Sequence, residues 1–462
     1  MNAKTGLRKN SIGLFSLIFF VVAAASPLTG VVGGLPVAIF AGNGAGIPVV
    51  YLLACLILMT FSVGFIAMSR HVTNAGAFYA YISLGLGRHS GAAASILALL
   101  GYISIQIAIV SMLGFFTEAL LSQHFRAAPP WWVLSGAFVA IVWVMSIKKV
   151  EIGGKILGVL MLAEVAIMLL TDTAIVTQKA GSLTFAPFTP AVFMDGHLGI
   201  AFIFAIAAYI GFESTAIYGE ECREPQKTVP RATLCSLLII TAFFSFTSWA
   251  LVQAWDINQI SAIARRDPGN FVFDITRQYV GQWAVDTMSI LLITSLFAAT
   301  LAFHNNIARY FFSIARDGLI WHTLSATHPH HGTPHHACHV YSLVLMALLG
   351  AMGLAGLDPM AQIFAFGSAI ATLSVLVLQT GVSAAVLAFF HRRPQLNHNR
   401  WQIRYAPLLS LCFMAGTIVL VVENLQLLSG SDSRLIMGIP WLILLCVALG
   451  YLLAWRRPVV AL

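Results

Sequence analysis

Residues Ser26 to Pro36 read SPLTGVVGGLP, and they interrupt the first long apolar segment of the chain. Two prolines and three glycines fall within this stretch. Proline removes a backbone donor and glycine weakens a helix, so a straight helix cannot run through it. Non-helical backbone at membrane depth is tolerated only where protein or a polar cavity satisfies its amide and carbonyl groups. The stretch therefore predicts a broken membrane helix beside a cavity.

The composition around this stretch is that of a membrane protein. Of the 462 residues 59% are hydrophobic and 9% are charged, whereas a soluble domain carries about 25% charged residues. A crossing needs about 20 apolar residues, so twelve crossings fit and leave only short loops. We expect an all-α polytopic membrane protein whose twelve transmembrane helices lie near residues 12–41, 48–69, 91–122, 131–148, 154–177, 197–219, 231–256, 284–313, 338–357, 362–391, 404–428 and 436–455.

The basic residues predict the orientation. With a cytoplasmic N-terminus, these spans put 19 of the 25 lysines and arginines inside and 6 outside, as the positive-inside rule requires. The even number of spans then puts both termini in the cytoplasm, and we expect a multi-pass protein of the cell inner membrane. A signal peptide at the N-terminus would leave eleven spans and destroy this alternation, so we expect the first helix to be retained. The basic residues are scattered among short loops, which argues against nucleic acid as a partner.

A second interruption lies in the sixth predicted span, where Tyr209 to Ser214 read YIGFES. Spans one and six open the two halves of a five-plus-five division. Breaks at corresponding places in two halves indicate an inverted-repeat transporter whose substrate lies between the broken helices. Glycine and proline are generally more common in membrane helices, but that explains one break better than two in register.

Several linked motifs extend over nearly the whole chain, in the same order and spacing as in a known family. They are Pro27-x-Thr29, AGAFYAY at 75–81, GFES at 211–214 with Glu220-Glu221 and Pro225 to Pro230 behind it, ARDG at 315–318, and HPxxGTP at 328–334. Together they resemble the amino acid, polyamine and organocation (APC) permease superfamily.

The resemblance implies the LeuT-type fold in one permease domain, 1–462. Its first repeat would cover 12–177, the inverted second repeat 197–391, and two peripheral helices 404–455. It also implies secondary transport of an amino acid or an amine. The chain has Thr29-Gly30-Val31 where the commonest members have Gly-Ser-Gly, so the resemblance leaves the substrate open.

Two acidic residues within predicted spans are candidates for coupling or gating, because ionisable groups at membrane depth are costly and usually functional or paired. Glu213 lies at the second break, where it could carry a proton or hold exposed backbone amides, and we favour the second role. Glu164 has no cation within a helical turn, and the resemblance puts it where some proton-coupled relatives hold a lysine in place of sodium. A buried carboxylate that takes up a proton is a proton carrier, whereas an ionised one favours a metal cation. Pairing of Glu164 across the bundle is the alternative.

The two breaks also supply candidates for substrate binding. A substrate carboxylate is expected on the free amides of the helix that starts after Gly30, and the amine at carbonyl ends near Ser26 and Tyr209. By register with the family, Gln106 from span three and Phe303 from span eight should face the substrate, although Phe303 and Tyr209 could equally be packing residues. The predicted substrate-binding set is Ser26, Pro27, Thr29, Gly30, Val31, Gly33, Gln106, Tyr209, Gly211, Phe212 and Phe303.

Other classes of function find little support in the sequence. It has no GxxxxGK[ST] loop for ATP and no protease motif in its spans, so we expect no enzyme and no cofactor. Six histidines between His328 and His339 lie in a predicted cytoplasmic loop without the spacing of a metal site, so no metal is expected. The expected partners are a small-molecule substrate, protons or a counter-substrate, and the lipid bilayer. A polyamine or ethanolamine permease and a membrane-embedded nutrient sensor remain the alternatives.

Overall fold

The computed structural model describes residues 12–125, 128–148, 154–396, 399–428 and 434–456. Helices make up the regular structure of these ranges, in which one isolated bridge joins Ile12 and Cys222 and no strand forms. The predicted all-α class is confirmed.

Nine helical segments in the described ranges are long and apolar enough to cross a membrane. They are Leu14–Ser69, Arg88–Ser122, Trp131–Lys148, Gly158–Gln178, Pro225–Gln253, Gln282–Arg316, His335–Leu354, Pro359–His391 and Trp401–Leu425. The first of them, 56 residues long, accounts for two crossings because the backbone leaves helical geometry at Gly42 and Gly44. Two shorter apolar helices, Leu198–Ala207 and Ile439–Trp455, complete a set that is consistent with the predicted twelve.

The crossing helices keep close to the predicted bounds. They are α1 (Leu14–Ala25), α4 (Ile47–Ser69), α6 (Arg88–His124), α7 (Trp131–Lys148), α8 (Gly154–Gln178), α10 (Leu198–Ala207), α12 (Pro225–Gln253), α15 (Gln282–Arg316), α16 (His335–Leu354), α17 (Ala365–His391), α18 (Ala406–Leu428) and α20 (Ile439–Arg456). The largest differences are at the two broken spans, where α1 ends at Ala25 and α10 at Ala207 within the predicted 12–41 and 197–219. Among the unbroken spans, α12 begins six residues before the predicted 231. Its first residue is Pro225, and proline suits the first helical position because the N–H it lacks would have no partner there.

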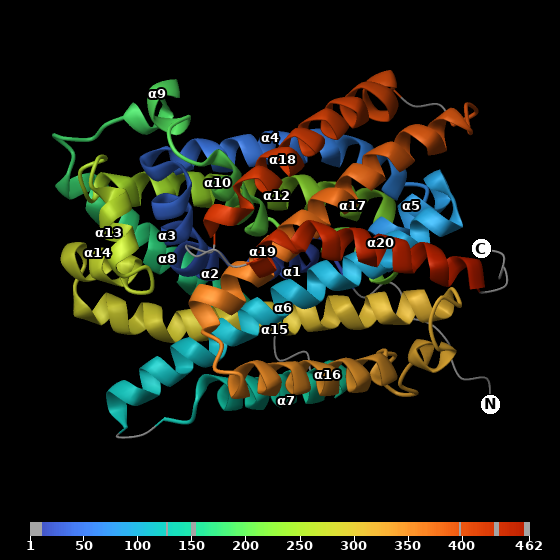
Figure 1. The fold of residues 1–462 in the computed structure, drawn as a ribbon, viewed down its shortest axis with the longest axis horizontal. Coiled ribbons are helices and arrows are strands. Elements are labelled where there is room, and N and C mark those ends of the chain that lie inside the picture. Colours follow the sequence, from blue (N-terminus) through green and yellow to red (C-terminus); the bar gives the residue numbers. More distant parts are fainter. Residues whose placement is uncertain (1–11, 126–127, 149–153, 397–398, 429–433, 457–462) are drawn as a thin grey trace.

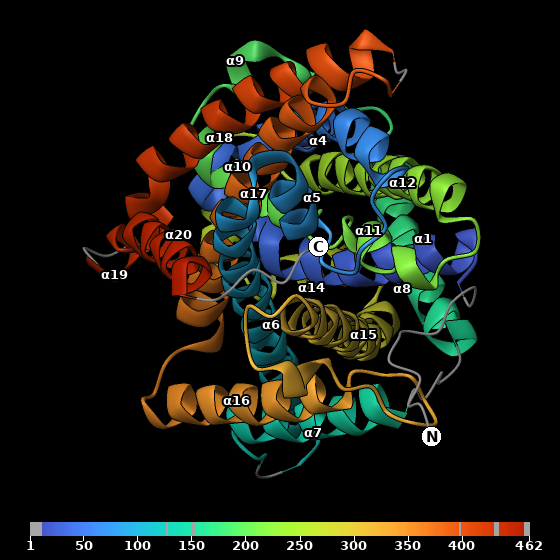
Figure 2. The same cartoon turned by 90° about the vertical axis from the view of Figure 1, so that its right-hand side faces the viewer.

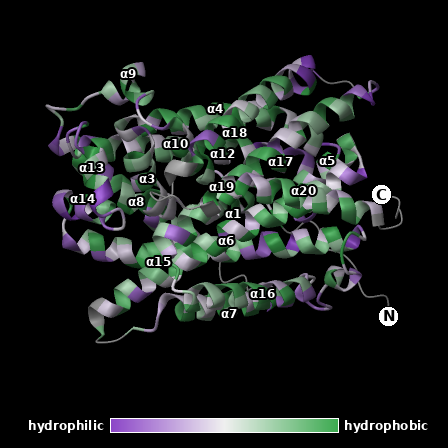
Figure 3. Ribbon diagram, in the orientation of Figure 1, coloured by the Kyte–Doolittle hydropathy of each residue, from purple (hydrophilic) through white to green (hydrophobic). Residues whose placement is uncertain are grey.

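Short helices connect the crossings on both sides of the bundle. They are α5 (Phe78–Leu86), α9 (Pro190–Phe193), α11 (Ser214–Ile217), α13 (Ile260–Arg266), α14 (Phe271–Tyr279) and α19 (Arg434–Met437). In Figure 1 the crossing helices run nearly parallel to the long axis, with α9, α13 and α14 at one end and α5 at the other. Figure 3 shows apolar residues along the crossings and hydrophilic residues gathered at these two ends. The α20 helix ends on the side where α1 begins (Figure 1), as an even number of crossings requires.

The two longest helices organise the bundle. The α6 and α15 helices, of 37 and 35 residues, pack against each other and against most of the other crossings. Viewed along the bundle in Figure 2, α7 and α16 form a pair on one edge, while α17, α18 and α20 lie on another. The broken helices α1 and α10 are enclosed by other crossings where they break: the last residues of α1 and most of α10 are buried. Their polar backbone there is shielded from lipid.

One close approach between helices depends on a glycine. The α5 and α17 helices meet at Gly85, where a Cβ atom would lie 2.6 Å from the Cα and Cβ atoms of Ala385 and would also collide with its carbonyl oxygen. Backbone atoms cannot rotate away as a flexible side chain can. Gly85 therefore sets how closely the two helices pack.

We expect Gly85→Val to lower the free energy of unfolding by about 1–3 kcal/mol, the usual effect of overpacking a tight contact. The measurement is the thermal unfolding midpoint of purified protein in detergent. Gly416→Val is the matched control, since a Cβ on this glycine of α18 meets nothing within 4 Å, and its effect should stay within about 0.5 kcal/mol. Equal midpoints for the two variants would contradict the close packing at Gly85.

Candidate functional site

The first break is narrower than the sequence predicts. The α1 helix ends at Ala25, and the next residue, Ser26, has a left-handed backbone with φ of 45° and ψ of 73°. A new helix, α2 (Pro27–Thr29), begins at once with Pro27 in its first position. Helical geometry then continues through a π-helical turn, η1 (Gly30–Gly34), and α3 (Leu35–Val37). The three glycines therefore lie within continuous helical backbone and do not interrupt it.

This geometry corrects the expected position of the free amides. The expectation was a helix start after Gly30, but the Gly30 N–H donates to the Ser26 carbonyl at 3.1 Å, and Gly30 is helical. The helix restarts at Pro27 because proline disfavours helical geometry in the residue before it. The amides of a first turn lack partners within the helix, so the available N–H groups are those of Leu28 and Thr29.

The second break separates α10 from α11. The backbone turns between Ala208 and Glu213, and Gly211 has a φ of 111° that residues with a side chain rarely adopt. The Glu213 carboxylate is buried and lies under this turn. It accepts one hydrogen bond from the Gly211 N–H at 3.1 Å and another from the Tyr102 hydroxyl at 2.7 Å. Glu213 thus ties the broken backbone to α6.

The two breaks lie side by side. A Cβ on Gly211 would lie 2.8 Å from the Ala24 Cβ in the last turn of α1, and 3.6 Å from the Phe303 ring of α15. The Asn306 amide, one turn further along α15, donates to the Ser214 hydroxyl at 2.6 Å. The α15 helix therefore contacts both broken helices at the level of the breaks.

Glu164 of α8 is linked to the first break through hydroxyl groups. Its side chain is buried at 3% exposure, and its carboxyl contacts the Ser295 hydroxyl of α15. Ser295 Oγ lies 2.7 Å from Ser26 Oγ, which donates to Thr29 Oγ1 at 2.6 Å. Within the described ranges Glu164 forms no ion pair, and its Oε2 has no hydrogen-bond partner. The carboxyl thus lies near the break, and none of the described cations is paired with it.

The other predicted site residues differ in what they contact. Gln106 of α6 donates from Nε2 to the Thr300 carbonyl at 3.1 Å, while its Oε1 and the Thr300 hydroxyl lack partners among the described residues. Tyr209 points instead toward α4 and α12, where its hydroxyl bonds to the Tyr51 carbonyl and the Thr241 hydroxyl. Phe212 packs edge-on against Phe61 of α4. Pro27 and Val31 are buried.

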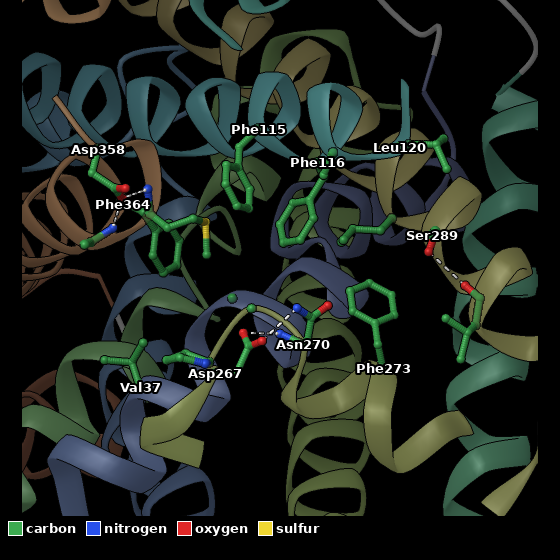
Figure 4. A pocket seen from close by; sticks show the side chains of 18 of the residues that line it. Val37, Phe115, Phe116, Leu120, Asp267, Asn270, Phe273, Ser289, Asp358 and Phe364 are labelled. Atoms are coloured by element: carbon green, nitrogen blue, oxygen red, sulfur yellow. Dashed lines mark hydrogen bonds between the residues drawn. The ribbon is translucent and has the colours of Figure 1, made fainter. Parts of the chain in front are cut away.

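A large cavity opens from the side of the molecule that carries α13 and α14. Its volume is about 1850 Å³, which exceeds the roughly 300–1,000 Å³ of a typical small-molecule pocket. Of the predicted site residues, Gly33 lines this cavity. Figure 4 shows the aromatic rings that project into it, Phe115 and Phe116 from α6, Phe273 from α14 and Phe364 from η7 (Pro359–Phe364). The cavity thus reaches the first broken helix beyond its break.

Ion pairs lie on the opposite side of the breaks. Arg309 of α15 pairs with Glu221 at 2.8 Å, and little of either side chain is exposed, 11% and 4%. Arg316 pairs with Glu220 at 3.0 Å, and Glu220 also accepts from the Ala75 N–H at 2.9 Å. These contacts join the segments that follow α4 and α11 to the end of α15.

A tyrosine and a carboxyl group extend the same network. The Tyr79 hydroxyl of α5 donates to Asp317 at 2.5 Å and lies 2.7 Å from the Ser313 hydroxyl. Burial raises the pKa of the Asp317 carboxyl, while its bond from Tyr79 and the charge of Arg316 act in the opposite direction. The cavity thus lies on one side of the breaks and these ion pairs on the other.

Sequence reasoning missed two residues of this site. Tyr102 precedes Gln106 by four residues, so both lie on one face of α6, and that spacing could have identified it. Ser295 gave no comparable signal, since a single serine in an apolar helix commonly bonds its own backbone.

Comparisons with known proteins agree with the geometry. The sequence pattern of the family described as "Amino acid permease" matches residues 17–458. The branched-chain amino acid permease BcaP of Bacillus subtilis (strain 168) is 24% identical over 411 residues, covering 84% of this chain and 82% of that protein. The low-affinity putrescine importer PlaP of Escherichia coli (strain K12) is 22% identical over 457 residues, covering 95% and 92%.

A solved structure shares the fold. The crystal structure of MhsT in complex with L-phenylalanine has a TM-score of 0.57 to this structure and 15% sequence identity, covering 90% of this chain and all of that one. The predicted LeuT-type fold is confirmed by this likeness. The relatives are permeases and not enzymes, and the many apolar helices make the chain a multi-pass membrane protein. By the match over residues 17–458, the chain belongs to the amino acid permease family.

Proposed function

We propose that the protein transports an amino acid or a related amine across the cytoplasmic membrane by alternating access, coupled to protons or to counter-exchange. The observation that carries this proposal is the pair of adjacent broken helices, with a cavity that reaches the first of them beyond its break on one side and ion pairs on the other. In an alternating-access cycle this state faces one compartment and is closed to the other. The side closed by Arg309 and Arg316 is the cytoplasmic one by the positive-inside rule, so the cavity faces outward.

The substrate lies, in this proposal, between the two breaks. Its carboxylate binds at the positive end of the helix that restarts at Pro27, near the Leu28 and Thr29 amides. Its amine faces the last carbonyls of α1 and the unpartnered oxygens of Gln106 and Thr300. Gly30, Gly33 and Gly211 allow close approach, and Phe303 covers the second break.

The surroundings of Gly33 support an amino acid with an apolar side chain. A Cβ on Gly33 would meet the Met112 side chain at 2.5 Å and the Phe364 ring at 3.4 Å, and Phe364 stacks on Phe204. The carboxyls that line the same cavity, Asp267, Asp286 and Asp358, already accept hydrogen bonds from neighbouring groups of the protein. An amine such as the putrescine imported by PlaP is the second candidate, because PlaP matches over more of this chain than BcaP does.

Glu164 is the proposed coupling residue. It is buried, it contacts Ser295, and no described cation neutralises it. A carboxyl in this position can bind a proton in one state of the cycle and release it in another. The change in its charge would then alter the hydrogen bonds of the Ser295 and Ser26 hydroxyls, and so affect the first break. Glu213 has the separate role of holding the second break. Sodium in place of the proton is the alternative occupant.

The wider organisation follows the same proposal. Residues 12–177 form the first repeat and 197–391 the second, with 404–455 as two additional helices. Both termini are cytoplasmic, and the membrane is the inner one. A nutrient sensor without transport is distinguished by uptake of labelled substrates into proteoliposomes, which a sensor would not support.

We expect Gly211→Leu and Gly30→Leu each to abolish uptake while the protein still inserts into membranes. Gly211 has a positive φ, and a Cβ on Gly30 would lie 2.6 Å from the Phe244 ring, so each leucine deforms a break. The measurement is initial uptake of labelled amino acids and amines by proteoliposomes, with insertion checked by reconstitution yield. Gly416→Leu in α18 is the control and should transport normally. Near-normal kinetics in either break variant would refute the site.

We expect Glu164→Gln to keep substrate binding and one-for-one exchange but to lose accumulation driven by pH. With one proton per substrate, a gradient of about one pH unit supports roughly tenfold accumulation, because one unit corresponds to about 1.36 kcal/mol. The variant should approach equal concentrations inside and outside. Glu423→Gln, an exposed glutamate of α18, is the control and should accumulate substrate like the parent.

Two results would change the assignment of Glu164. Accumulation by Glu164→Gln at the parental level under a pH gradient would exclude it as the proton site. A parent that needs sodium and ignores pH would make the carboxylate a sodium ligand, and the variant should then lose sodium dependence together with uptake.

A further inference from the structure

The α8 helix carries a second buried carboxyl group, Asp172. It follows Glu164 by eight residues, which is about 12 Å along a helix. Its side chain has no exposed surface. The buried residues of α8 form one stripe with the spacing of a core-facing helix surface, and both carboxyls belong to it. This stripe is Glu164, Ile167, Met168, Thr171, Asp172 and Ile175.

The hydrogen bonds of Asp172 leave one oxygen unused. Thr247 of α12 donates from its hydroxyl to Asp172 Oδ2 at 2.7 Å. Asp172 Oδ1 has no partner among the described residues. A carboxylate in an apolar interior normally has a cation or several donors. One hydroxyl does not meet that requirement.

No described cation faces Asp172 from the elements packed on α8, which are α1, α2, α12, α14 and α15. The α1 and α2 helices contain no titratable residue. In α14, Asp274 and Arg277 pair with each other, and the Tyr279 hydroxyl donates to the Ala254 carbonyl. The titratable groups of α12 and α15 lie toward their cytoplasmic ends or at the exposed start of α15, and they are Lys227, Arg231, Cys235, Asp286, His304, Arg309, Tyr310 and Arg316.

We propose that Asp172 is a second proton-binding site of the transporter, on the outer side of the first break and in series with Glu164. A proton neutralises the carboxyl where no cation does, and an unpaired charge at this depth is far more costly than a neutral acid. A sodium ion fits less well, because the Thr247 hydroxyl donates a hydrogen bond to Asp172 and the described residues hold no group of three or more His, Cys, Asp or Glu that could bind a metal ion. This inference rests on the proposed proton coupling.

The α14 helix lies between the outer cavity and the part of α8 that carries Asp172. Phe273 lines the cavity from α14, and the buried Thr276 follows it one turn later on the same helix. The Thr276 hydroxyl lies 3.5 Å from that of Thr171, the neighbour of Asp172. Asp172 is thus the carboxyl nearer the cavity and Glu164 the one at the break. A proton from outside reaches Asp172 first.

Infrared spectroscopy of the purified full-length protein in nanodiscs tests the site without a substrate. The C=O stretch of a protonated carboxyl is followed while the pH is raised through neutrality. The parent should lose two such bands, Asp172→Asn should lack one of them, and Glu164→Gln should lack the other. Asn still accepts the Thr247 hydrogen bond, so packing is preserved. Asp286→Asn, an exposed site on α15, is the control and should resemble the parent.

A second variant keeps the carboxyl and removes only its donor. Thr247→Val should change the frequency of the Asp172 band without abolishing it, which identifies the band even if Asp172→Asn fails to fold. An Asp172→Asn spectrum identical to that of the parent would overturn the proposal. So would a Thr247→Val spectrum without any change. A band that responds to added sodium but not to pH would also overturn it.

Transport measurements separate this inference from the proposed function. In proteoliposomes with a trapped pH indicator, Asp172→Asn should keep one-for-one exchange but take up fewer protons per substrate than the parent. A purely structural role for Asp172 would leave that ratio unchanged and would overturn the inference. If the infrared bands titrate as expected while the parent shows no pH-driven uptake, the proton site stands and the proposed coupling fails.

Discussion

Backbone amide and carbonyl groups need partners at membrane depth, and this requirement governs how the two broken helices are built. At the first break a single left-handed residue, Ser26, changes the direction of the chain, and its carbonyl is at once used by Gly30. At the second break the turn is wider, and the Glu213 carboxylate supplies an acceptor for the Gly211 amide. Both solutions put polar atoms at the centre of an apolar bundle, and the surrounding helices are arranged to shield them from lipid.

The second break also connects the centre of the bundle to its closed side. Glu220 and Glu221 follow α11 within a few residues, and they pair with Arg316 and Arg309 on α15. Because α11 is a single short turn between the break and these pairs, any swing of α11 away from α15 must separate them. Buried pairs such as Arg309 and Glu221 are strongly unfavourable to break singly. Closure on this side and the geometry at Gly211 are therefore mechanically linked.

The sequence predicted both broken helices and the helical class, because proline, glycine and buried acids have strong and local backbone or charge effects. It could not predict where the first helix restarts, because each of the two prolines and three glycines in SPLTGVVGGLP is a possible place for a break. In the structure the only break in this stretch is at Ser26, directly before Pro27. It also missed contacts between distant residues, such as Tyr102 with Glu213 and Ser295 with Ser26. Asp172 escaped notice because its isolation depends on α12 and α14 covering α8, which no local pattern reveals.

The first broken helix contains a π-helical turn from Gly30 to Gly34, and this turn allows the helix to change its length and rotation. A turn that closes hydrogen bonds between residues five apart holds one residue more than an α-helical turn. If that turn returns to α-helical bonding, the chain on one side of it rotates by about 100° and advances by about 1.5 Å relative to the other side. The wall of the cavity can thus exchange the side chains it presents by rotation about its own axis, without giving up its backbone hydrogen bonds and without any helix tilting as a whole.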